Sequence, residues 1–193
     1  PGDPRATLDD VDVTYWEDET LEGTLAMKLE SQRTDELTRL GELVAKIGIG
    51  MLTTVADQGT LRSRPLATLK MDAEPALWFL TSISSAKINE LDESGLASVS
   101  YSDGQSHFIS VSGKTQIIRD REVISELWTP LAKTWFPAGV DDPDLAALKV
   151  QVHQAEYWDG PDGRLTQLYA LTKAAITGDD DALGDHEKLR VPR

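Results

Sequence analysis

The chain has 193 residues, of which 40% are hydrophobic and 27% charged, a composition typical of a folded globular protein. Its length favours one compact domain. The 19 Lys and Arg residues against 33 Asp and Glu give a net charge of −14, which argues against nucleic-acid binding because such a surface repels a phosphate backbone. The absence of cysteine excludes disulfides, thiolate zinc sites, iron–sulfur clusters and cysteine nucleophiles.

The sequence also predicts where the protein resides. No apolar run approaches the length that spans a bilayer, and the acidic start lacks the basic and apolar segments of a secretory signal. We therefore expect a cytoplasmic protein with no membrane partner.

Residues 1–33 are acidic and weakly periodic, and we interpret them as an extension that precedes a domain over residues 34–190. A helix is expected at the start of this domain, behind Thr34 as a possible N-cap. The apolar residues that recur there at helical spacing are Leu37, Leu40, Val44 and Ile47. The domain therefore opens with a helix that packs one face against the core.

A hairpin is expected next. Residues 49–55 are rich in β-forming side chains, residues 57–59 form a turn, and residues 62–71 alternate as a second strand. A further turn over residues 72–75 then leads into a buried strand at residues 76–81.

The middle of the chain predicts a short helix and two more strands. The helix spans residues 84–92, with Ile88 and Leu91 facing inward, and the strands span residues 96–101 and 108–118. Gly113 interrupts the second of these strands, which indicates a bulge or a close approach of two backbones.

The remaining elements complete a mainly β domain with flanking helices. Asp120 is expected to cap a helix whose apolar stripe ends near residues 136–139, and an Asp- and Pro-rich turn covers residues 141–144. That stripe consists of Val123, Ile124, Leu127, Trp128 and Leu131. A last long strand follows over residues 148–157, and a helix over residues 165–176. About six strands with short helices fit a small barrel better than a doubly wound sheet.

Basic and hydroxyl side chains gather at the end of the buried strand and on the neighbouring hairpin strand. These residues are Arg62, Arg64, Thr81, Ser82, Ser85 and Lys87. Hydroxyl donors, a helix N-terminus and formal positive charge are the parts that a phosphate monoester needs. The alternative is that Ser84 or Ser85 is only an N-cap and that the basic side chains are solvated surface charges.

A second group of residues brings in a family resemblance. Glu156-Tyr157-Trp158, then Gly160 and then Arg164-Leu165, resembles the end of the barrel in the pyridoxamine 5′-phosphate oxidase-like flavoproteins. Further parts that resemble this family are Arg64 to Lys70, Leu80-Thr81 with Lys87, and Ser112-Gly113-Lys114. Within the family, the general stress protein 26 group is similar at Arg64-Pro65, at Trp135-Phe136-Pro137 and at Gly184 to His186.

The resemblance implies a six-stranded split β-barrel that forms a homodimer and binds FMN, or FAD, in sites built from both subunits. Thr81, Ser82, Ser85 and Lys87 would hold the phosphate, together with Arg62 or Arg64. The backbone from Leu66 to Thr68 would line the edge of the isoalloxazine ring, and Trp158 of the other subunit would close the pocket. Lys70 and Arg164 would be the remaining contacts to a substrate.

Departures from the family pattern separate the functional hypotheses. Thr166 and Leu168 replace a His and an Arg of true pyridoxamine-phosphate oxidases, Phe108 replaces a flavin-contacting Gln, and residues 135–151 lack the substrate-phosphate cluster. The chain is thus a flavin-dependent oxidoreductase, a stress or sensor flavoprotein without efficient turnover, or a dimeric carrier of a phosphorylated ligand. A metal site is not expected, because the three histidines have no ligand spacing.

Overall fold

The computed structural model describes residues 27–159 and 185–190, which form a mainly β fold. The helices are α1 (Asp35–Ile47), α2 (Lys87–Ser94) and α3 (Arg121–Leu127). The strands are β1 (Lys28–Leu29), β2 (Ile49–Val55), β3 (Leu61–Ala67), β4 (Lys70–Met71), β5 (Ala76–Ser82), β6 (Leu96–Ser102), β7 (His107–Ile118), β8 (Leu145–Asp159) and β9 (Asp185–Arg190). The expected class, mainly β with flanking helices, is confirmed.

All nine strands belong to one sheet, in the order β1-β4-β5-β8-β7-β6-β2-β3, with β9 paired to β8. Six strands were expected, and the difference comes from the two-residue strands β1 and β4 and from β9. The strand expected over residues 62–71 is divided into β3 and β4, because the chain stops pairing with β2 at Thr68 and then pairs with β5. Thr68 N donates to Gly48 O over 2.8 Å, and Leu69 N donates to Trp78 O over 2.9 Å.

Helix α1 forms as the sequence predicts. The Thr34 hydroxyl accepts a hydrogen bond from Leu37 N, and the helix ends at Gly48, whose φ of 73° favours glycine. Four large apolar side chains of α1 are buried, namely Leu37, Leu40, Leu43 and Val44. They join the inward-facing residues of the strands in one core, where burial of apolar area is the main favourable contribution to folding.

Helix α3 is shorter than its apolar stripe suggests. Asp120 caps it as expected, accepting hydrogen bonds from Glu122 N and Val123 N. The helix ends at Leu127 because Pro130 cannot continue it, and a 3-10 turn over Pro130–Thr134 follows. Leu131 therefore lies on this turn and not on the helix.

Gly113 marks a close approach of two strands, as predicted. The register between β7 and β8 shifts at Ser112/Gly113, and a Cβ atom on Gly113 would lie 1.9 Å from the carbonyl oxygen of Gln151. Only glycine fits this backbone crossing.

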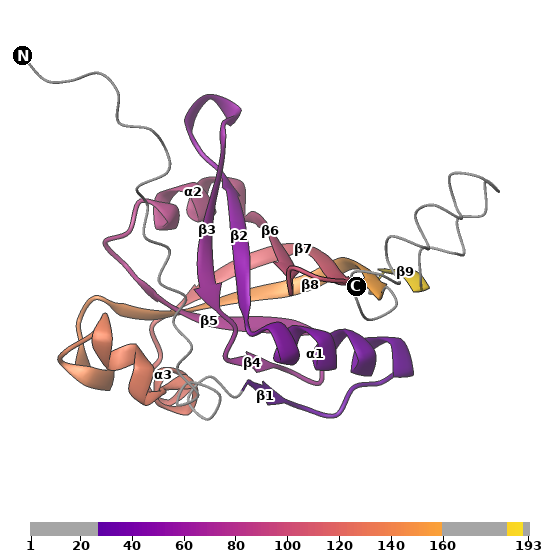
Figure 1. The fold of residues 1–193 in the computed structure, drawn as a ribbon. Helices are drawn as coiled ribbons and strands as arrows, with labels where there is room; N and C mark the ends of the chain where they lie inside the picture. Colours follow the sequence, from indigo (N-terminus) through magenta and orange to yellow (C-terminus); the bar gives the residue numbers. More distant parts are fainter. Residues whose placement is uncertain (1–26, 160–184, 191–193) are drawn as a thin grey trace, which may run out of the picture.

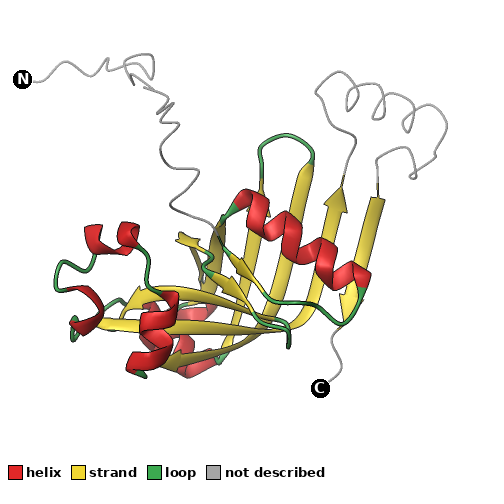
Figure 2. Cartoon of the chain, turned by 90° about the horizontal axis from the view of Figure 1, so that it is seen from below, coloured by secondary structure: helices red, strands yellow, loops and turns green. Residues whose placement is uncertain are grey.

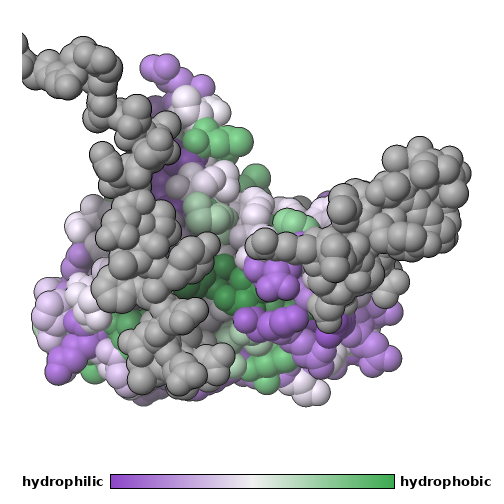
Figure 3. All heavy atoms as spheres, viewed as in Figure 1, coloured by the Kyte–Doolittle hydropathy of each residue, from purple (hydrophilic) through white to green (hydrophobic). Residues whose placement is uncertain are grey.

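The arrangement of the layers is visible in two orthogonal views. Helix α1 lies across the strands on one side, while α3 and the 3-10 turns over Pro130–Thr134 and Gly139–Asp141 gather at another end of the sheet (Figures 1 and 2). Hydrophilic and hydrophobic residues are mixed over the face seen in the space-filling view (Figure 3). The helices that the structure describes are all too short or too polar to cross a membrane. The expected helix over residues 165–176 lies outside the described residues.

Candidate functional site

A pocket of about 540 Å³ lies where β5 ends and α2 begins. Its apolar wall consists of Pro65, Leu66, Ala67, Leu69, Leu80, Leu131, Ala132, Trp135 and Phe136. Its polar lining consists of Thr81, Ser82, Lys87, Thr129 and Asp144. An apolar cavity with a few convergent polar groups is the usual form of a small-molecule site.

The polar end of the pocket carries a hydroxyl and an ammonium group whose hydrogen-bonding capacity is not used up. Thr81 is only 3% exposed, and its Oγ1 has no hydrogen-bond partner within the described part of the chain. Lys87 is 9% exposed, and its Nζ donates to Ser85 Oγ over 3.0 Å. Burial, and then the charge of Arg64, lower the pKa of Lys87. Buried polar groups without partners are costly, so a ligand that accepts hydrogen bonds here would remove part of that cost.

Asp144 brings a carboxylate to the same end of the pocket. Its Oδ2 accepts hydrogen bonds from Ser82 Oγ at 2.5 Å and Ser84 Oγ at 3.0 Å, and its Oδ1 accepts one from Ser84 N at 2.7 Å. These bonds, the one from Ser82 first, lower the pKa of Asp144, so the carboxylate is charged at neutral pH. The turn over residues 141–144 was expected, but its contact with the start of α2 was not.

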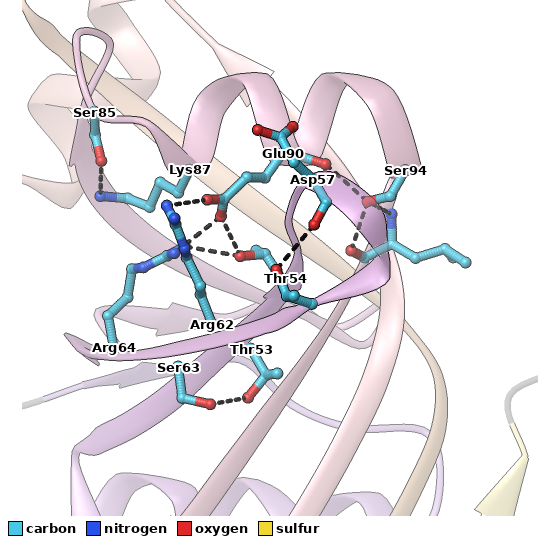
Figure 4. Close-up of polar contacts among 12 residues, drawn as sticks. Thr53, Thr54, Asp57, Arg62, Ser63, Arg64, Ser85, Lys87, Glu90 and Ser94 are labelled. Atoms are coloured by element: carbon cyan, nitrogen blue, oxygen red, sulfur yellow. Dashed lines mark hydrogen bonds and ion pairs between the residues drawn. The ribbon is translucent and has the colours of Figure 1, made fainter.

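The two arginines expected at the phosphate do not line the pocket. Arg64 donates from Nη1 to Thr54 Oγ1 over 2.8 Å and from Nη2 to Glu90 Oε2 over 2.9 Å, and Arg62 Nη1 lies 3.3 Å from Glu90 Oε1. Thr54 Oγ1 also donates to Glu90 over 2.5 Å, and this bond is the main cause of the lowered pKa of Glu90. In Figure 4 the Lys87 ammonium points away from this cluster toward Ser85. Both arginines are therefore held by a buried carboxylate one helical turn beyond Lys87.

The alternative role of Ser84 or Ser85 as a helix N-cap is wrong for the described structure. Helix α2 starts at Lys87 with Ala86 at the N-cap position, and no side chain caps it. The Ser84 hydroxyl is bonded to Asp144 and the Ser85 hydroxyl accepts from Lys87, so neither is used for capping.

Three further residues were expected around a flavin ring. Leu66 lines the pocket. Thr68 is buried elsewhere, where its hydroxyl lies 2.8 Å from the Tyr101 hydroxyl. Trp158 is 38% exposed and lines a separate groove of about 410 Å³ on the outer face of the sheet, together with Ile49, Met51 and Phe108.

Of the two residues expected at a substrate, Lys70 does not line the pocket. The Lys70 ammonium lies within 3.1 Å of the carboxylates of Glu30, Asp72 and Glu126, and the bond to Glu30 is the main cause of its raised pKa. Lys70 thus joins β4 to neighbouring segments. Arg164 lies outside the described residues.

Sequence reasoning missed Glu90 and Asp144, and gave Trp135 and Phe136 no role in a site. Glu90 could have been found from its spacing, since a residue three positions after Lys87 on a helix lies on the same face. No local signal indicates the contact of Asp144 with Ser82, because 62 residues separate them.

The described residues thus define a class of protein: a mainly β domain with a pocket of mixed polar and apolar lining beside its sheet. Residues 35–181 match the family model described as pyridoxamine 5′-phosphate oxidase like, and the chain belongs to this family. The resemblance stated from the sequence is thereby confirmed.

Solved structures and a curated protein support the assignment. A protein related to general stress protein 26 from Clostridium acetobutylicum has a TM-score of 0.61 at 21% identity, covering 80% of this chain and 94% of that one. A general stress FMN/FAD binding protein from Xanthomonas citri has a TM-score of 0.59 at 25% identity, covering 67% and 93%. Protein bli-3 of Neurospora crassa is 25% identical over 138 residues, which are 66% of each chain. The fold matches the split-barrel proteins of this family.

Proposed function

We propose that the protein is a flavoprotein that binds FMN, or FAD, in the pocket at the start of α2. The observation that carries this proposal is the pairing of a polar end with an apolar wall in one cavity. The hydroxyl of Thr81, which has no partner among the described residues, and the ammonium of Lys87, with Ser85 beside it, suit the flavin phosphate. Leu66, Leu131 and the rest of the apolar wall suit the ring system.

The bound flavin would supply redox chemistry, and the chain would supply binding and orientation. We propose a flavin-dependent oxidoreductase of the general stress protein 26 group that lacks the full pyridoxamine-phosphate substrate site. The second candidate is a flavin-binding sensor or carrier without turnover. It is favoured by Lys70, which three carboxylates hold away from the pocket.

We further propose that two copies of the chain pair through the outer face of β2, β6, β7 and β8, with Trp158 contributing to the partner's flavin site. Ile49, Met51 and Phe108 are each more than 40% exposed on this face. The residues that pair across β2, β6 and β7 on this face are mostly uncharged; for example, Met51 pairs with Ser100, and Ser100 pairs with Ser110. A neutral, partly apolar face is unusual on a chain with a net charge of −14, and it suits a second copy of itself.

Mass spectrometry of the ligand released from purified protein, with its absorbance spectrum, tests flavin binding directly. We expect FMN or FAD, and a phosphorylated molecule without a flavin would instead support the carrier. Turnover of NAD(P)H by the flavin-loaded protein separates the oxidoreductase from the sensor. Protein that releases no ligand and binds neither flavin on titration would refute the proposal.

A further inference from the structure

Asp144 takes up hydrogen-bond donors that an anion in this pocket would need. Its carboxylate accepts from the hydroxyl groups of Ser82 and Ser84 and from the backbone N–H of Ser84. Hydroxyl and backbone N–H donors are the kinds that bind a phosphate, and Ser82 is one of the residues expected there. Ile83 N also donates to the Asp144 carbonyl oxygen over 2.7 Å, so the turn is fixed against the end of β5. The chain therefore places its own anion beside the expected phosphate position.

The Asp144 carboxylate weakens the binding of an anion in two ways. The hydroxyl of Ser82 already donates to Asp144, so the side-chain donors that remain for a ligand between residues 81 and 87 are Thr81, Ser85 and Lys87. In addition, a negative charge in the pocket lining repels a second negative charge, and the repulsion grows with the charge of the ligand. The charged groups that act on Lys87 nearby are Arg64, Glu90 and Asp144 itself.

We propose that Asp144 is a specificity-determining residue that disfavours a phosphate monoester with two negative charges in this pocket relative to a phosphate of a diphosphate, which carries one negative charge. The inference rests on the proposed flavin site, and it concerns the choice between FMN and FAD. The phosphate next to the ribityl chain is a monoester in FMN, with a second pKa of about 6, whereas in FAD it is one half of a diphosphate and carries one charge, the second charge lying on the next phosphate. Riboflavin has no charge at this position.

The test compares wild-type protein with Asp144→Asn, which has nearly the same shape but no charge. At pH 8 we expect the variant to bind FMN on the order of tenfold tighter, FAD about threefold tighter, and riboflavin with affinity changed by less than about twofold. At pH 5.5, where FMN is mostly a monoanion, the gain for FMN should fall to about that for FAD. The matched control is Asp35→Asn on α1, which makes the same change in net charge outside the pocket.

A second variant keeps the proposal testable if Asp144→Asn does not fold by circular dichroism. Because the Ser82 hydroxyl already donates to Asp144, Ser82→Ala in wild-type protein should change FMN affinity by less than about twofold, whereas a direct phosphate ligand would lose about tenfold.

Three results would overturn the inference while leaving flavin binding intact: equal gains for all three ligands, no gain for FMN, or a large loss in Ser82→Ala. Wild-type protein that binds none of the three ligands would overturn both proposals.

Discussion

Replacing Lys87 by Met removes the charge at the polar end of the pocket while keeping the length of the side chain. The Lys87 ammonium is buried and donates to Ser85 Oγ, and no carboxylate pairs with it among the described residues. A charge-assisted contact to phosphate contributes roughly 1.5–3 kcal/mol, so FMN affinity should fall on the order of tenfold to a hundredfold. Riboflavin affinity should not change, because riboflavin carries no phosphate.

The same substitution should stabilise the ligand-free protein. Burial lowers the pKa of Lys87, so the unfolded chain binds this proton more tightly, and stability rises as the pH increases toward the ordinary value of 10.5. Lys87→Met removes that cost at neutral pH, and a gain of about 1 kcal/mol would raise Tm by about 2–4 °C. Fluorescence titration with both ligands and thermal unfolding without ligand measure the two effects. Equal losses for FMN and riboflavin, or a lower Tm, would refute the reasoning.

Three further predictions concern the supporting structure. Glu90→Gln should lower stability at neutral pH by about 1–3 kcal/mol in urea unfolding. The pKa of Glu90 is lowered because the fold stabilises its ionised form, so the difference in stability from wild type should shrink as the pH falls below 4.5. A difference that does not depend on pH would contradict this. Gly113→Ala should lower stability by about 1–3 kcal/mol or more, because its Cβ would meet the Gln151 carbonyl; an unchanged Tm would show that the strands can separate there. Phe108→Asp should convert the proposed dimer to a folded monomer in sedimentation, and a dimer that persists in the variant would place the interface elsewhere.

The fold was largely predictable because local patterns and burial agree along the strands. The apolar residues at helical spacing behind the cap at Thr34 form the buried face of α1, and the apolar run at the start of β5 is the buried strand that the sequence predicts. The break at Thr68 was not predictable, since the alternating pattern continues through it and only pairing with β5 divides the strand. The early end of α3 could have been predicted from Pro130.

The candidate site was predictable in part. Thr81, Ser82 and Lys87 meet in one pocket because the end of a strand and the start of the next helix are adjacent in sequence. The partners that orient them come from distant segments: Glu90 turns Arg62 and Arg64 away, and Asp144 binds Ser82. Local residue types indicate which donors are present, but tertiary contacts decide which of them are already in use.

The long strand β8 has a consequence for how the protein is made. It pairs with β5 from Ala76↔Gln151 to Ser82↔Leu145 and with β7 along its length, so both of these strands have an open edge until residues 145–159 leave the ribosome. Most side chains of β5 are apolar and buried in the finished sheet, and an exposed apolar edge is a template for aggregation. Pairing across such sequence distances is also slow. Chains that stop before Leu145 should therefore accumulate as insoluble protein, whereas the full chain closes both edges with a single strand.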